Sequence, residues 1–286
     1  MEQRLAEVLA NTQSPNASLR NGAEETLLSL CTDRTFPLCL ANISSATTHP
    51  LPLRQTALLS LKNLILAGWS PHLDEFKGQV LVSEDVKPTI RDALLNLAIS
   101  DSAERKIQNA ASYVVAKIAS SDYPHDWDGL VPNLLHFLPQ ASDNRLHGIL
   151  KVLLELVQDG FNEEQFFGIA QDLIGALYLV ATNSHRPAGT RALAVSILRA
   201  CFDTLETIME MHKAAVKAFA EQALGQWLSF FFDVLQTRLP ASAEVDGPLK
   251  SANTNDHRKG VVAFKLQVVK VRVSSSRLGA NDTDSS

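Results

Sequence analysis

The sequence has little cysteine, few aromatic residues and no long hydrophobic run, and each scarcity excludes a class of protein. Its 286 residues include three cysteines and 6% aromatic residues. Cys31, Cys39 and Cys201 form no Cys-x-x-Cys pair, so we interpret them as small apolar residues in a reducing compartment. The low aromatic content argues against an all-β protein. No run of 18 uncharged apolar residues or apolar signal segment occurs, so we expect neither membrane insertion nor secretion.

A basic excess is also missing. The net charge is −5 and the isoelectric point is near 5.9, which argues against direct binding of nucleic acid. Residues 241–286 carry seven basic and five acidic residues, so the first 240 residues hold a net charge of −7. An acidic body favours basic protein partners.

Catalytic and metal-binding motifs are missing as well. The sequence contains no GxGxxG, P-loop, GxSxG or HExxH pattern. Its eight histidines are scattered, and none lies three or four residues from another histidine or a cysteine. We therefore expect no enzymatic activity, no metal site and no cofactor.

What the sequence has in abundance is leucine and alanine, with 42 and 33 copies. Apolar residues recur every three or four positions in segment after segment, which is typical of amphipathic helices. Prolines interrupt these stripes, and Pro37, Pro88 and Pro187 suit the first turn of a helix. The pattern predicts about eleven helices before residue 240 and no strand pair.

The sequence also shows a repeat that is much longer than the helical period. Several predicted helices begin with a basic residue followed three positions later by a small one. In the third of the five cases below, the basic residue is Lys106, which lies one position before the first residue of the pattern. The five cases are Arg20-x-x-Ala23, Arg54-x-x-Ala57, Ile107-x-x-Ala110, Arg145-x-x-Gly148 and Arg191-x-x-Ala194. Spacings of roughly 40 residues are typical of HEAT and armadillo repeats. We predict an all-α, right-handed α-α superhelix; a generic helix bundle is the alternative.

Several of these segments resemble the importin N-terminal domain of the karyopherin-β family. The resemblance rests first on residues 19–24 (LRNGAE), 35–40 (TFPLCL) and 53–65 (LRQTALLSLKNLI), the last running into Trp69. Residues 121–127 (SDYPHDW) resemble the turn after the third importin repeat, with Asp128 where the family has proline, and residues 145–153 (RLHGILKVL) resemble the helix that follows. The importin-9 type is the most similar, over roughly residues 1–240.

The resemblance implies a nuclear import receptor that binds the GTP form of the small GTPase Ran. By motif it implies Ran contacts at Lys62, Asn63 and Asn109, although a solvated helix face explains the same residues. GTP would belong to the partner.

Further implied partners are nuclear pore proteins and basic cargo, histones being the cargo class that the subfamily suggests, with a location in the cytoplasm, the nucleus and at the pore. Candidate cargo residues are Asp122, Asp126 and Asp128, although helix capping accounts for many single acids. A HEAT scaffold without Ran binding is the alternative function.

Other conspicuous residues are interpreted as structural. Arg20 and Arg54 are expected to pair with carboxylates of neighbouring helices. Trp69, Tyr123 and Trp127, like the aromatic run 230–232, are expected to pack rather than to bind a ligand.

The chain is expected to divide into an importin N-terminal domain at 1–100 and further HEAT repeats at 101–239. A polar linker at 240–257 would precede the start of another repeat helix at 258–270, whose valine-rich sequence alone would also suit a strand. Residues 271–286 resemble nothing in the family, so we expect a disordered tail from a truncated or mis-spliced product of a longer receptor.

Overall fold

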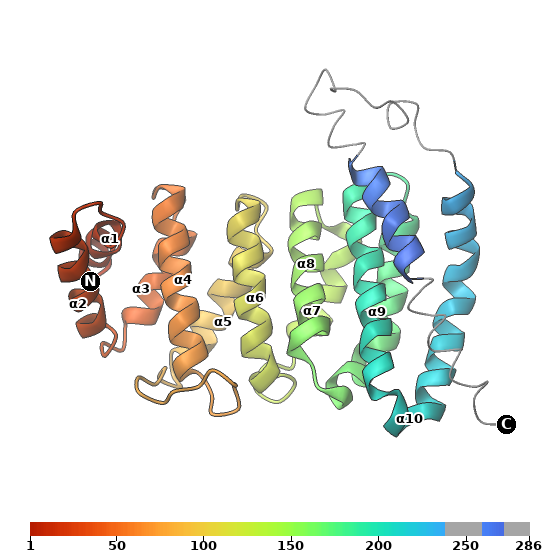
Figure 1. The fold of residues 1–286 in the computed structure, drawn as a ribbon, viewed down its shortest axis with the longest axis horizontal. Coiled ribbons are helices and arrows are strands. Elements are labelled where there is room, and N and C mark those ends of the chain that lie inside the picture. Colours follow the sequence, from red (N-terminus) through yellow and green to blue (C-terminus); the bar gives the residue numbers. More distant parts are fainter. Residues whose placement is uncertain (238–258, 272–286) are drawn as a thin grey trace, which may run out of the picture. The chain divides into compact units, whose positions relative to one another are not determined.

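The computed structural model describes residues 1–237 and 259–271. Within these residues every regular element is helical and none is a strand, which confirms the predicted all-α class. The chain forms two compact units, Met1–Tyr123 and the part from Pro124 onward. Figure 1 shows the helices of both units.

The first unit consists of three helix pairs. The paired helices pack side by side, and so do α4 and α6 of successive pairs, while α1, α3 and α5 form the other layer (Figure 1). The helices are α1 (Glu2–Asn11), α2 (Ala17–Leu30), α3 (Phe36–Ser45), α4 (Leu51–Gly68), α5 (Lys87–Ala98) and α6 (Arg105–Asp122). We call α2, α4 and α6 the second helices of their pairs.

The second unit begins with two short helices and ends with two long ones. Its elements are α7 (Leu130–Phe137), a 3₁₀ turn (Leu138–Gln140), α8 (Asp143–Glu155), a π-helical turn (Leu156–Gly160), α9 (Glu163–Thr182) and α10 (Ala188–Gln236). α10 is two helices joined at His212, whose backbone has φ −128° and ψ 33°. Counting it as two, the part before residue 238 has the eleven helices that the periodicity predicted.

Local chemistry explains where several helices begin. The Asn16 side chain accepts the backbone N–H groups of Ser18 and Leu19 at the start of α2, satisfying donors that have no partner inside the helix. Asn162 and Gln165 form a reciprocal capping box at the start of α9.

The predicted prolines also lie at helix starts. Pro37 and Pro88 occupy the first turns of α3 and α5, where a missing N–H costs nothing. Pro187 lies one residue earlier, at the N-cap of α10.

A recurring hydrogen bond joins the two helices of a pair. Near the start of α4, Arg54 Nε donates to the Ser44 carbonyl at 3.0 Å, and Arg191 Nε of α10 donates to the Ala181 carbonyl at 2.7 Å. Both carbonyls lie in the last turn of the preceding helix, where they have no helical partner. In α6 the corresponding donor is Gln108, whose Nε2 donates at 2.8 Å to the Ser100 carbonyl, just beyond the end of α5.

The contact corrects the predicted register of the third repeat. The small residue three positions after Gln108 is Ala111, which is fully buried, as Ala57 and Ala194 are after their arginines. Ala110 is exposed and so is Lys106. The repeat in α6 is therefore Gln108-x-x-Ala111, and Lys106 is a surface residue.

The C-terminal expectations are only partly within the described residues. The predicted linker at 240–257 and tail at 271–286 lie outside them, apart from Val271. Residues 259–271 are a helix rather than the alternative strand.

Among the described helices, α9 alone has the length and apolar composition to cross a bilayer. Core helices pass the same test, and α9 buries Phe166, Leu173 and Leu177 and packs against α10.

Candidate partner-binding face and its supporting cluster

The residues nominated for Ran lie on two neighbouring second helices of the first unit. Lys62 and Asn63 lie in the C-terminal half of α4, and Asn109 lies near the start of α6. The two asparagines are exposed, and Lys62 is half-buried. We call the surface that these helices share the α4–α6 face.

A cavity of about 230 Å³ opens between the two helices. It is lined by Gln55, Leu58, Leu59 and Lys62 from α4 and by Lys106, Ile107, Ala110, Tyr113 and Val114 from α6. Its floor is apolar, because Leu58, Ile107 and Val114 are at most 1% exposed. Lys62 therefore lies at a cavity, whereas Asn63 and Asn109 are outside its lining.

Basic groups surround the one tyrosine of this cavity. Lys62 Nζ lies 4.5 Å from the centre of the Tyr113 ring and Lys117 Nζ lies 5.8 Å from it, both within the range of cation–π attraction. Lys117 also pairs with Glu75 at 3.5 Å. The arrangement suits an apolar side chain accompanied by an acidic or carbonyl oxygen.

Sequence reasoning missed Tyr113, Lys106 and Leu59 as parts of this surface. Leu59 is 55% exposed, directly after the buried Leu58. The sequence does signal Leu59, because this residue is apolar but falls outside the buried stripe of its helix.

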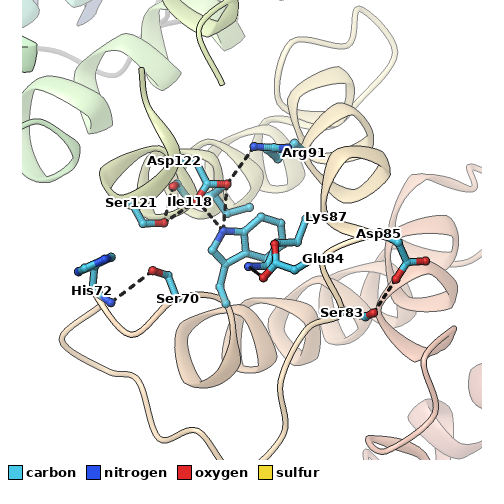
Figure 2. Close-up of polar contacts among 11 residues, drawn as sticks. Ser70, His72, Ser83, Glu84, Asp85, Lys87, Arg91, Ile118, Ser121 and Asp122 are labelled. Carbon is cyan, nitrogen blue, oxygen red and sulfur yellow. Dashed lines mark hydrogen bonds and ion pairs between the residues drawn. The ribbon is translucent and has the colours of Figure 1, made fainter. Parts of the chain in front are cut away.

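Asp122 is not available to cargo, which corrects its assignment as a cargo residue. It is buried, and its carboxylate accepts the Trp69 indole N–H at 3.0 and 3.1 Å and the Ser121 hydroxyl at 2.7 Å. Arg91 Nη1 pairs with the same carboxylate at 3.1 Å. Figure 2 shows Ser121 and Arg91 converging on Asp122. The last residue of α6 thus holds α4 and α5 together.

Trp69 and the loop that follows α4 complete the cluster around Asp122. Trp69 is 2% exposed, and Lys87 Nζ lies 5.2 Å from the centre of one of its rings. The loop folds back so that the N–H groups of Lys77 and Val82 donate to the carbonyls of Ala67 and Gly68. It comes so close that a Cβ on Gly68 would lie 1.9 Å from the Val80 carbonyl oxygen.

Arg54 is a buried link between successive pairs. It is 2% exposed, and beyond its bond to Ser44 its Nη1 contacts both carboxylate oxygens of Glu104 at 2.8 and 2.9 Å. Glu104 is the N-cap residue of α6. Arg54 therefore does pair with a carboxylate of a neighbouring helix, as expected.

Arg20 differs from that expectation. Its Nη1 donates to the Ser14 carbonyl at 3.1 Å, in the turn between α1 and α2. The turn before α2 lies close enough to Arg20 for the Ser14 carbonyl oxygen, instead of a carboxylate, to accept its N–H.

The remaining nominated residues lie around the start of the second unit. Asp126 and Asp128 are exposed, and Asp128 accepts the Gly129 N–H at 2.7 Å. Trp127 is half-buried. Tyr123, at the C-cap of α6, is also half-buried, and burial raises the pKa of its hydroxyl.

The aromatic run 230–232 is divided between core and surface. The Phe230 ring lies 5.9 Å from the Trp227 ring and 6.0 Å from the Phe264 ring, and Phe231 is 4% exposed. Phe232 is 51% exposed. Two of the three therefore pack, as expected.

Residues 23–100 match the family model described as the importin-beta N-terminal domain. Over 248 residues the chain is 32% identical to "Importin subunit beta-5" of Schizosaccharomyces pombe, covering 86% of this chain and 25% of that protein. It is 25% identical over 213 residues to "Importin-9" of Drosophila melanogaster, covering 73% of this chain and 20% of the relative. The chain thus spans a quarter or less of the length of these relatives.

The fold also matches solved structures. Yeast importin-beta (Kap95p) aligns over 100% of this chain and 36% of its own, with a TM-score of 0.61 and 18% identity. The exportin Cse1 in its cargo-free, cytoplasmic state aligns over 93% of this chain and 28% of its own, with a TM-score of 0.64 and 18% identity. These matches confirm the predicted HEAT-repeat superhelix.

Proposed function

We propose that this chain, which belongs to the karyopherin-β (importin-β) family, acts in nuclear transport by binding Ran-GTP through the α4–α6 face. The observation that carries the proposal is the cavity between two second helices, with Lys62 at its edge and a tyrosine inside it. An apolar floor supplies contact area, and the lysines supply attraction for acidic and carbonyl groups.

Relatives of the same fold support a GTPase partner. A solved structure described as "Kap95p Binding Induces the Switch Loops of RanGDP to adopt the GTP-bound Conformation" aligns over 100% of this chain with a TM-score of 0.53 and 18% identity. Another is described as a "Kap95:Nup1 complex". We extend both partner classes, Ran and nuclear pore proteins, to this chain, together with movement between cytoplasm and nucleus.

For cargo, we propose basic proteins, histones among them. The first 240 residues carry a net charge of −7, and Asp126 and Asp128 remain exposed. Exposed acids raise the rate at which a basic partner meets the surface. Asp122 has no part in this proposal, because its carboxylate is buried and occupied.

A pull-down of the whole chain on immobilised Ran tests the proposal. We expect retention on Ran loaded with a non-hydrolysable GTP analogue and much weaker retention on Ran-GDP. Lys62→Glu should weaken binding about tenfold or more, because it reverses a charge at the edge of the cavity.

The matched control is Lys77→Glu. Lys77 is exposed in the loop after α4, outside the cavity lining, and the substitution makes the same change in net charge. Equal losses from both variants would refute the assignment to this face. If the chain does not distinguish the two nucleotide states of Ran, the receptor proposal fails and a Ran-independent scaffold remains.

A further inference from the structure

One side of α6 carries a line of residues that continues past the cavity of the α4–α6 face. Lys106, Ala110 and Tyr113 line the cavity, and Lys117 follows Tyr113 after four positions. Intervals of three and four residues keep side chains on one side of a helix. Lys117 therefore lies one turn beyond the cavity, on the side of α6 that lines it.

The loop after α4, which runs past the ends of α4 and α6 (Figure 1), places a carboxylate against this lysine. Glu75 Oε1 lies 3.5 Å from Lys117 Nζ, whereas a charged N–H···O hydrogen bond is about 2.7–2.9 Å long. The Glu75 side chain is 41% exposed, so water screens the attraction. Such a loose, exposed ion pair can be broken at little cost in free energy.

The charge around the cavity is positive on an acidic body. Lys62 and Lys106 line the cavity and Lys117 lies beside it, and among the described residues neither Lys62 nor Lys106 has a carboxylate partner. These three lysines and Glu75 leave a net charge of +2, whereas the first 240 residues together have −7. This surface therefore attracts an acidic group that the rest of the body repels.

Tyr113 joins the apolar and the charged parts of the site. It lines the cavity, and its ring centre lies 4.5 Å from Lys62 Nζ and 5.8 Å from Lys117 Nζ. A partner's apolar side chain in the cavity would thus have a lysine within a few ångströms. Neighbouring residues of a partner are only about 3.8 Å apart between Cα atoms, so the next side chain can reach that lysine.

We propose that the α4–α6 face selects a segment of Ran in which an aspartate or glutamate adjoins a large apolar side chain, and that Glu75 competes with this acid for Lys117. The apolar side chain enters the cavity, and the partner's carboxylate displaces Glu75. Glu75 therefore lowers the affinity of the face for its partner. The inference rests on the proposed binding of Ran-GTP, and it adds the chemistry of the contact and a residue that regulates it.

The test is the affinity of the whole chain for immobilised Ran loaded with a non-hydrolysable GTP analogue. Glu75→Gln should bind about two- to fivefold more tightly than the wild type, because no internal carboxylate then holds Lys117. Asp74→Asn is the matched control. Asp74 is the adjacent exposed acid of the same loop, has no partner among the described residues, and gives the same change in net charge. It should leave the affinity nearly unchanged.

Lys117→Gln completes a double-mutant cycle. Alone it should weaken binding about threefold or more, because the partner's carboxylate loses its cation. In the Lys117→Gln background, Glu75→Gln should have no further effect, since the competition acts through Lys117.

Three results would overturn the inference while leaving Ran binding intact. Equal gains in Glu75→Gln and Asp74→Asn would show that net charge alone matters. A gain that persists in Lys117→Gln would show that Glu75 acts elsewhere, and a loss in Glu75→Gln would show that Glu75 positions Lys117 for binding. If neither the wild type nor Glu75→Gln binds Ran-GTP, the proposed function fails and this inference fails with it. Binding by Glu75→Gln alone would support both.

Discussion

Replacing Asp122 with alanine should destabilise the first unit without any direct effect on a binding surface. The substitution removes the acceptor of three donors at once: the Trp69 indole, the Ser121 hydroxyl and the Arg91 guanidinium. Trp69 is buried, and the Arg91 side chain is 12% exposed, so water replaces the lost acceptor poorly.

The cost follows from the two kinds of donor. A neutral hydrogen bond contributes about 1 kcal/mol, and a charged one about 1.5–3 kcal/mol. Removing one partner of a buried ion pair costs about 3–5 kcal/mol, because the remaining charge is left without compensation. The terms overlap at a single carboxylate, so we expect a total of about 3–5 kcal/mol. Asp122→Asn, which keeps an oxygen acceptor but no charge, should cost less.

Hydrogen exchange read by mass spectrometry gives the result segment by segment, since a repeat protein need not unfold in one step. Slow amides in α4 and α6 should lose protection by roughly a hundredfold or more in Asp122→Ala, by the conversion of about 1.4 kcal/mol per tenfold. Asp126→Ala is the control, as an exposed carboxylate of the neighbouring turn. Unchanged protection in Asp122→Ala, combined with lost cargo binding, would refute our structural assignment and restore Asp122 as a cargo residue.

Two further experiments, one by substitution and one by chemical labelling, also address packing. Gly68→Ala should destabilise the first unit by about 2 kcal/mol or more, since its Cβ would meet the Val80 carbonyl oxygen; Gly22→Ala, where the added Cβ meets no atom within 4 Å, should be neutral or stabilising in thermal melts. Iodoacetamide at pH 8 should modify the partly exposed Cys31 before Cys201, because Cys201 is buried and burial raises the pKa of its thiol. Equal rates in mass spectra of the folded protein would contradict the buried placement of Cys201.

The helical architecture could be predicted because its causes are local. The apolar spacing, the prolines at helix starts and the small residues at 57 and 194 all act within one helix or one helix pair. The register of α6 could not be predicted in this way. A pattern that requires a basic residue points to Lys106, whereas the structural requirement is a side-chain N–H that reaches an unpaired carbonyl, and the Gln108 amide meets it.

The candidate face was predicted only in part, because it depends on which sides of two helices meet. Lys62 was nominated by motif, but Tyr113 is 51 positions away in sequence and comes near it only when α4 packs on α6. The Asp122 assignment was wrong for a related reason. An acid in a turn suggests an exposed side chain, but two of the three donors to Asp122, the Trp69 indole and the Arg91 guanidinium, are distant in sequence.

The Asp122 contacts also explain what the resemblance to importins can and cannot transfer. The two blocks that made the resemblance specific, the helix ending at Trp69 and the turn beginning at Ser121, are joined directly by the indole and the Asp122 carboxylate. Trp69 and Asp122, the residues that join the two blocks, therefore connect helices of the first unit rather than contact a partner. A chain can keep these residues, and with them the HEAT frame, while the exposed side chains of the α4–α6 face change. The Lys62 and Lys77 comparison is consequently needed to establish Ran binding, even though the fold is already established.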